Sequence, residues 1–94
     1  MSNDGKAVLV TTEHRGVFFG YLVGEPSKER LMLRRARMVV QWVGTRGVLG
    51  LAERGPTDEC RVGGAVPELE LWDITGVATC TPEAVERMER GPWR

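Results

Sequence analysis

The sequence predicts a mainly β protein of the small α+β class, built as a compact antiparallel sheet or a small SH3-like barrel. Two observations predict it. β-branched and aromatic residues alternate through the first half of the chain in the manner of half-buried strands. Helix start or stop signals then flank one short segment in the middle and another near the end. A length of 94 residues suits a single domain over residues 1–94 with one modest core, and we expect residues 1–5 to be disordered.

The first predicted unit is a β-hairpin. Residues 7–12 and 17–23 form its strands, and residues 13–16 read as the turn between them. Gly20 lies inside the second strand, where it has no side chain to pack. Such a glycine indicates a bulge, a sharp bend or the close approach of another backbone.

The third predicted strand, residues 31–42, changes phase. Leu31 and Leu33 share one face, whereas the later apolar residues Ala36, Met38, Val40 and Trp42 have the opposite parity. A strict period of two cannot bury both sets, so we predict a bulge near Arg34 and Arg35. If the later set points inward, the side chains of Arg35, Arg37, Val39 and Gln41 point outward. The bulge adds Arg34 to the same exposed side, so we expect the three arginines to lie together.

The second half is expected to contain two short helices and further strands. Thr45 is the expected cap of a helix over residues 48–54, and Gly55 and Pro56 end it. Residues 60–62, 68–72 and 74–80 are predicted strands. A C-terminal helix begins at Thr81 and Pro82, with Val85 and Met88 docked on the sheet, and with exposed ion pairs at Glu83–Arg87 and Glu86–Arg90.

Charge is segregated along the chain although the whole sequence is formally neutral. Net charge is −1 over residues 1–27, +5 over residues 28–46 and −4 over residues 47–94. A basic strand of this kind indicates an anionic partner. The candidate ligand-binding residues are Arg34, Arg35, Arg37, Trp42 and Arg46, together with His14 and Arg15 at the hairpin turn.

Each candidate also has a structural interpretation. Arginine forks fit phosphate oxygens, but a basic strand edge also prevents aggregation between sheet edges. Trp42 is suited to stack on a base, although its parity favours core packing. His14 is the only histidine and sits in a turn. Glu68 and Glu70 share a strand face, which is either solvated or complementary to the basic strand of a neighbouring subunit.

The sequence provides little for catalysis or metal binding. It has no Gly-rich phosphate loop, Gly-x-Ser-x-Gly elbow or His-Glu-x-x-His motif, so we expect no enzymatic activity and no cofactor. Cys60 and Cys80 lack the partners of a zinc site and are interpreted as small, partly buried hydrophobes. Without a secretion signal or a membrane-spanning stretch, the expected location is the cytoplasm, away from any membrane.

Several segments have a recognisable pattern: residues 36–44, 17–23 and 66–69, the ending 80–84, and Pro92 and Trp93. Over about residues 7 to 93 they resemble a family of small phage and prophage proteins that carry a domain of unknown function. It implies a viral accessory protein acting in the host cytosol, and it transfers no activity. Family members usually have a second arginine where this chain has Met38, and aromatic residues at Val40 and Gln41.

The first functional hypothesis is therefore a non-enzymatic phage anti-defence protein. It would form a homo-oligomer and sequester a small anionic, nucleotide-derived immune signal at a subunit interface. The alternatives are a small-barrel module that binds nucleic acid and a direct protein–protein inhibitor of a host factor. Overall neutrality argues against the nucleic-acid module, because such modules usually carry a basic excess.

Overall fold

The computed structural model describes residues 5–13, 16–25, 27, 29–42, 47–57 and 59–90. Its elements follow the order of the predicted ones. They are β1 (Ala7–Thr12), β2 (Val17–Leu22), β3 (Arg30–Gln41), α1 (Val48–Arg54), β4 (Arg61–Val62), β5 (Val66–Trp72), β6 (Ile74–Thr79) and α2 (Pro82–Arg90).

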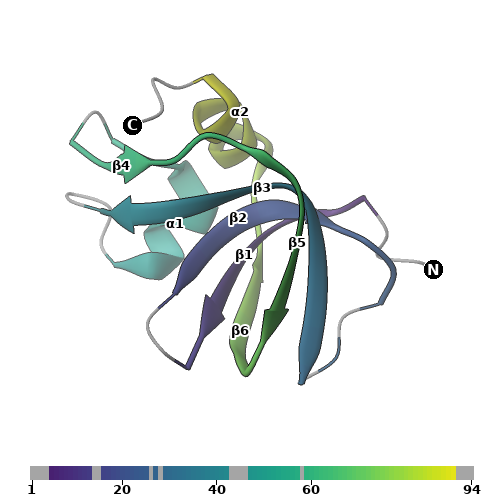
Figure 1. Ribbon diagram of the computed structural model, residues 1–94. Coiled ribbons are helices and arrows are strands. Elements are labelled where there is room, and N and C mark those ends of the chain that lie inside the picture. Colours follow the sequence, from purple (N-terminus) through teal and green to yellow (C-terminus); the bar gives the residue numbers. More distant parts are fainter. Residues whose placement is uncertain are drawn as a thin grey trace.

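The strands form one antiparallel sheet with the order β4-β3-β2-β1-β6. The long strand β3 also pairs with β5. β5 pairs with the first part of β3, and β4 pairs with its last part. The sheet curls until β5 and β6 meet at Asp73, which links them (Figure 1). Within the described ranges no pairing joins β5 to β6. The predicted antiparallel sheet with two short helices is thus confirmed, as an open sheet rather than a closed barrel.

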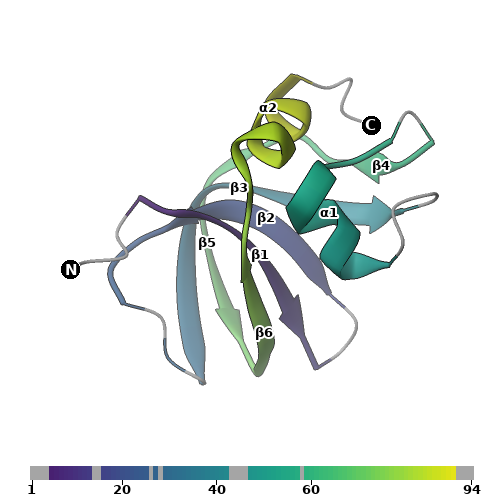
Figure 2. The ribbon, with the colours of Figure 1, turned by 180° about the vertical axis from the view of Figure 1, so that it is seen from behind.

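The curl gives the sheet two buried faces. Figure 2 shows both helices on one of them. The core on this helix-covered face consists of Leu9, Val17, Phe19, Val39, Leu51, Ala52, Cys60, Val62, Cys80, Ala84 and Met88. The core on the other face lies within the curl and consists of Val8, Val10, Leu22, Leu31, Leu33, Ala36 and Leu71. Neighbouring residues of one strand, such as Val8 and Leu9, are therefore both buried.

Local signals fix the helix ends. Thr81 caps α2, because its Oγ1 accepts a hydrogen bond of 3.1 Å from the amide of Ala84. α1 begins after Gly47 and ends at Gly55, both at positive φ; the predicted cap Thr45 lies outside the described residues. The ion pairs Glu83–Arg87 and Glu86–Arg90 form as predicted, at 3.3 and 4.0 Å. Neither of these helices is long and apolar enough to cross a membrane.

The predicted bulge in β3 is confirmed. Tyr21 pairs with Arg34 and Phe19 pairs with Arg37, so Gly20 alone faces two residues of β3. One of these two is Arg35, whose φ of 50° places it in the left-handed region. The extra residue shifts the phase of the strand at this point.

The predicted orientation beyond the bulge is partly wrong. Ala36 is buried as expected, but Arg37 and Val39 point into the helix-covered face, only 3% and 2% exposed. Met38 and Val40 are about half exposed. The reason is that the helices cover the Arg37 side of β3, whereas the core within the curl ends at Ala36.

A substitution at Gly20 tests the bulge. An added Cβ would lie 2.9 Å from the Cβ of Leu33 and 3.2 Å from the carbonyl oxygen of Arg34. Gly20→Ala should therefore lower the free energy of unfolding by about 1 to 3 kcal/mol, measured by urea denaturation. Gly64→Ala is the matched control, since nothing lies within 4 Å of the position that its added methyl group would take, and its φ is not positive. An equally small effect of both substitutions would contradict the close packing at Gly20.

Candidate anion-binding site

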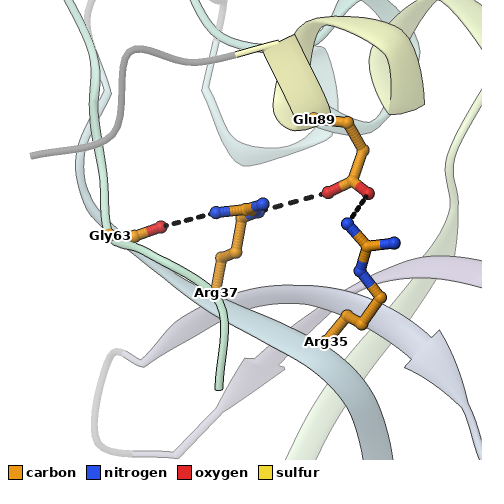
Figure 3. A network of polar contacts seen from close by, with 4 residues as sticks. All are labelled: Arg35, Arg37, Gly63 and Glu89. Atoms are coloured by element: carbon orange, nitrogen blue, oxygen red, sulfur yellow. Dashed lines mark hydrogen bonds and ion pairs between the residues drawn. The ribbon is translucent and has the colours of Figure 1, made fainter. Parts of the chain in front are cut away.

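The carboxylate of Glu89 joins the last turn of α2 to the bulge of β3. Its Oε2 lies 2.8 Å from Nη2 of Arg35, and its Oε1 lies 3.2 Å from Nε of Arg37. Figure 3 shows both guanidinium groups rising from β3 toward this single carboxylate. Each carboxylate oxygen therefore serves a different arginine. Charge-assisted bonds of this kind are the strongest hydrogen bonds that side chains make.

Arg37 is held at both ends of its guanidinium group. Besides Glu89, it donates from Nη1 to the carbonyl oxygen of Gly63 at 3.3 Å. Gly63 follows β4, where its own amide donates to the carbonyl oxygen of Met38. The chain between β4 and β5 thus closes over Arg37. A buried charge is tolerated only with such partners, because desolvation costs several kcal/mol.

Tyr21 adds a hydroxyl beside this carboxylate. Burial raises the pKa of Tyr21, and the charge of Glu89 and its capacity to accept a hydrogen bond raise it further, while Arg35 and Arg37 lower it. The phenol therefore stays protonated near neutral pH and can donate to an oxyanion. Its ring is set by an edge-on contact with Phe19, with centroids 5.6 Å apart.

The structure brings together three of the candidate ligand residues. Arg34, Arg35 and Arg37 lie at the bulge, with Arg34 and Arg35 exposed and Arg37 buried. Trp42 is half-buried and packs against the core of the helix-covered face, in agreement with its packing interpretation. The other candidates, His14, Arg15 and Arg46, lie outside the described residues.

The acidic face of β5 meets the basic strand of its own chain. Oε1 of Glu70 lies 3.3 Å from Nε of Arg30, and Glu68 is the register partner of Arg34. The sequence suggested solvent or a neighbouring subunit as the partner of these acids. Arg30 of the same chain pairs with Glu70, whereas Glu68 is exposed, in agreement with the solvated interpretation.

Glu89 was not among the sequence-predicted site residues. One signal could have identified it: Glu89 follows the buried Met88 and lies one turn after Val85, which packs on the core. This position places it at the border of the apolar stripe of α2. Glu83 and Glu86, by contrast, lie on the exposed face with their arginine partners.

The cysteines are buried hydrophobes, as predicted. Both belong to the core of the helix-covered face, and neither forms a disulfide. The Sγ of Cys60 lies 3.3 Å from the amide of Thr57. Burial raises the pKa of Cys80 from 9.0 to about 11. In the part of the chain that the structure describes, no three His, Cys, Asp or Glu side chains are grouped as metal ligands.

The curled sheet, its helix-covered face and the arginine–carboxylate cluster define a small α+β domain with a charged site at a β-bulge. Residues 5–88 match the family described as a domain of unknown function, DUF6948, and the chain belongs to this family. The matched residues include the three arginines and end one residue before Glu89. No curated protein and no solved structure matches the chain.

Removing the charge of Glu89 should destabilise the protein strongly. Glu89→Gln leaves Arg37 buried without its carboxylate, and we expect a loss of about 2 to 4 kcal/mol in the free energy of unfolding. Glu86→Gln is the control on the same helix. Its pair with Arg90 is exposed, so the expected change is below about 0.5 kcal/mol. Urea denaturation of both variants measures the difference, and equal losses would refute the buried pair.

Stability should fall as pH rises from 9 toward 11. The folded state raises the pKa of Cys80 to about 11, so the unfolded chain loses this proton first and stability is lost above pH 9. The loss at pH 11 is on the order of 2 kcal/mol. The raised pKa of Tyr21 also makes stability fall as pH rises. Urea denaturation of wild type and Cys80→Ala across this range separates the contribution of the thiol from that of Tyr21. Parallel curves for the two proteins would contradict this assignment.

Proposed function

We propose that this protein is a non-enzymatic binding protein that sequesters a small anionic ligand at the β-bulge of β3. One observation carries the proposal. The bulge gathers Arg34, Arg35 and Arg37 within four residues, and two of the three share the single carboxylate of Glu89. Guanidinium groups remain charged at every physiological pH and match the geometry of phosphate oxygens.

The backbone at Arg35 supports a role beyond folding. Its φ of 50° is uncommon for a residue with a long side chain and costs roughly 1 to 2 kcal/mol relative to an extended conformation. Strain of this kind concentrates at functional sites. The strained conformation directs the Arg35 side chain to the same carboxylate that Arg37 contacts, while the side chain remains 63% exposed.

The proposed ligand is a nucleotide-derived immune signal, and the proposed setting is phage anti-defence in the host cytosol. The resemblance to small phage proteins supports the setting, and the arginines support a ligand with phosphate groups. The formal neutrality of the whole chain argues against the alternative of a nucleic-acid module, because such modules usually carry a basic excess.

The proposal includes a homo-oligomer. A domain of this size buries a modest core, and exposed apolar side chains on it favour a subunit contact. Met38 and Val40 are exposed on the face of β3 that points away from Arg37. A contact there would leave the arginine cluster open to ligand.

Ligand binding is tested on the purified wild-type protein. Native mass spectrometry before and after denaturation reports the stoichiometry and any co-purified small molecule. Calorimetry with a panel of cyclic nucleotides and ADP-ribose derivatives should then reveal at least one that binds and is released intact. No binding by any member of the panel, with no co-purified anion, would overturn the proposal.

Variants locate the site. Arg34→Gln and Arg35→Gln should each weaken binding by about tenfold or more, because each removes charge-assisted hydrogen bonds to the ligand. Arg54→Gln is the control, since Arg54 is an exposed arginine in the last turn of α1 and belongs to no part of the cluster. Equal weakening by all three variants would indicate a general charge effect instead of a site.

A further inference from the structure

The contacts of Glu89 have the form of an occupied anion site. Two arginines approach one carboxylate through its two oxygens, at 2.8 and 3.2 Å, and a neutral tyrosine hydroxyl lies beside it. The donors come from the neighbouring strands β2 and β3, whereas the carboxylate comes from the last turn of α2. Donors and acceptor therefore belong to different layers of the fold (Figure 3).

Arg37, the backbone of Arg35 and the ring of Tyr21 are each held by contacts other than those with Glu89. Arg37 is 3% exposed and is also held by the carbonyl oxygen of Gly63. The bulge sets the backbone of Arg35, and the edge-on contact with Phe19 sets the ring of Tyr21. We call these three donors, Arg35, Arg37 and Tyr21, the cradle. Donors that are held in place before binding bind an oxyanion at a lower entropic cost.

The acceptor is closer to solvent than the buried Arg37. The side chain of Glu89 is 23% exposed, and only Arg90 follows it in α2. The end of a helix opens more readily than its middle. An incoming oxyanion that takes the place of Glu89 keeps the buried Arg37 paired throughout, so the exchange avoids a buried unpaired charge.

We propose that Arg35, Arg37 and Tyr21 form a binding site for a phosphate group, and that Glu89 fills this site in cis until a phosphate group of the ligand displaces it. This inference rests on the proposed function for the identity of the ligand. The site itself is testable with inorganic phosphate.

The test is chemical rescue of Glu89→Ala. Removing the side chain leaves the cradle empty and the protein less stable. Inorganic phosphate should then raise its melting temperature by about 4 to 8 °C at roughly five times its dissociation constant, and further with the logarithm of the phosphate concentration, as expected for one bound ligand. Sodium chloride at equal ionic strength should give a smaller change. Glu86→Ala, on the exposed face of the same helix, controls for the general stabilising effect of phosphate.

A second variant ties the rescue to the cradle. Adding Arg37→Met to Glu89→Ala replaces the buried guanidinium by an apolar side chain, and the rescue by phosphate in excess of that by sodium chloride should disappear. If Glu89→Ala is unfolded in phosphate-free buffer, phosphate-dependent folding followed by circular dichroism replaces the melting temperature, and Glu89→Gln provides a second protein for the titration. Equal responses of Glu89→Ala, Glu86→Ala and the double variant would overturn the proposal.

Failure of this inference and failure of the proposed function are distinguishable. Rescue by phosphate without nucleotide binding to the wild type would support the phosphate site and contradict the proposed ligand. Nucleotide binding to the wild type without rescue of Glu89→Ala would support the proposed function and show that the ligand binds at another site.

Discussion

The buried guanidinium of Arg37 is the constraint on which the arrangement of this protein depends. A charge that is 3% exposed must be paired, and its partners come from two distant parts of the chain. The carboxylate of Glu89 requires α2 to lie over β3, and the carbonyl oxygen of Gly63 requires the chain between β4 and β5 to pass beside it. One side chain thus couples the sheet, the C-terminal helix and the edge of the long strand.

The bulge makes that constraint possible. Before the bulge, Leu31 and Leu33 pack in the core within the curl. After the bulge, Val39 packs in the core of the helix-covered face. A regular strand would turn Arg37 onto the face of Leu33, where the core is apolar and neither Glu89 nor Gly63 lies. Gly20, directly across from the extra residue, allows the backbones to approach. The two cores are therefore connected through a single irregularity in β3.

The sequence predicted the elements, the bulge and the cap at Thr81, because each depends on residues close together in the chain. The burial of Arg37 depends on which face the helices cover, a long-range property. Apolar residues occupy both parities after the bulge, as Met38 and Val39 illustrate, so periodicity alone could not decide between them. Glu89 was missed for a related reason. Its helix carries three glutamates, and only the docked position of α2 separates the one at the core border from the two in solvent.

The proposed anion must compete with acidic side chains that already pair with these arginines. Two acidic residues of the second half reach the basic strand: Glu70 pairs with Arg30, and Glu89 is shared by Arg35 and Arg37. Glu89 is tethered, and tethering gives it an effective concentration in the millimolar range or higher. A free monovalent carboxylate offers the arginines nothing that Glu89 lacks. A displacing ligand must bring more charge or more acceptor oxygens, and it gains further if a second anionic group reaches the exposed Arg34. These requirements favour phosphate groups in close succession over a single carboxylate.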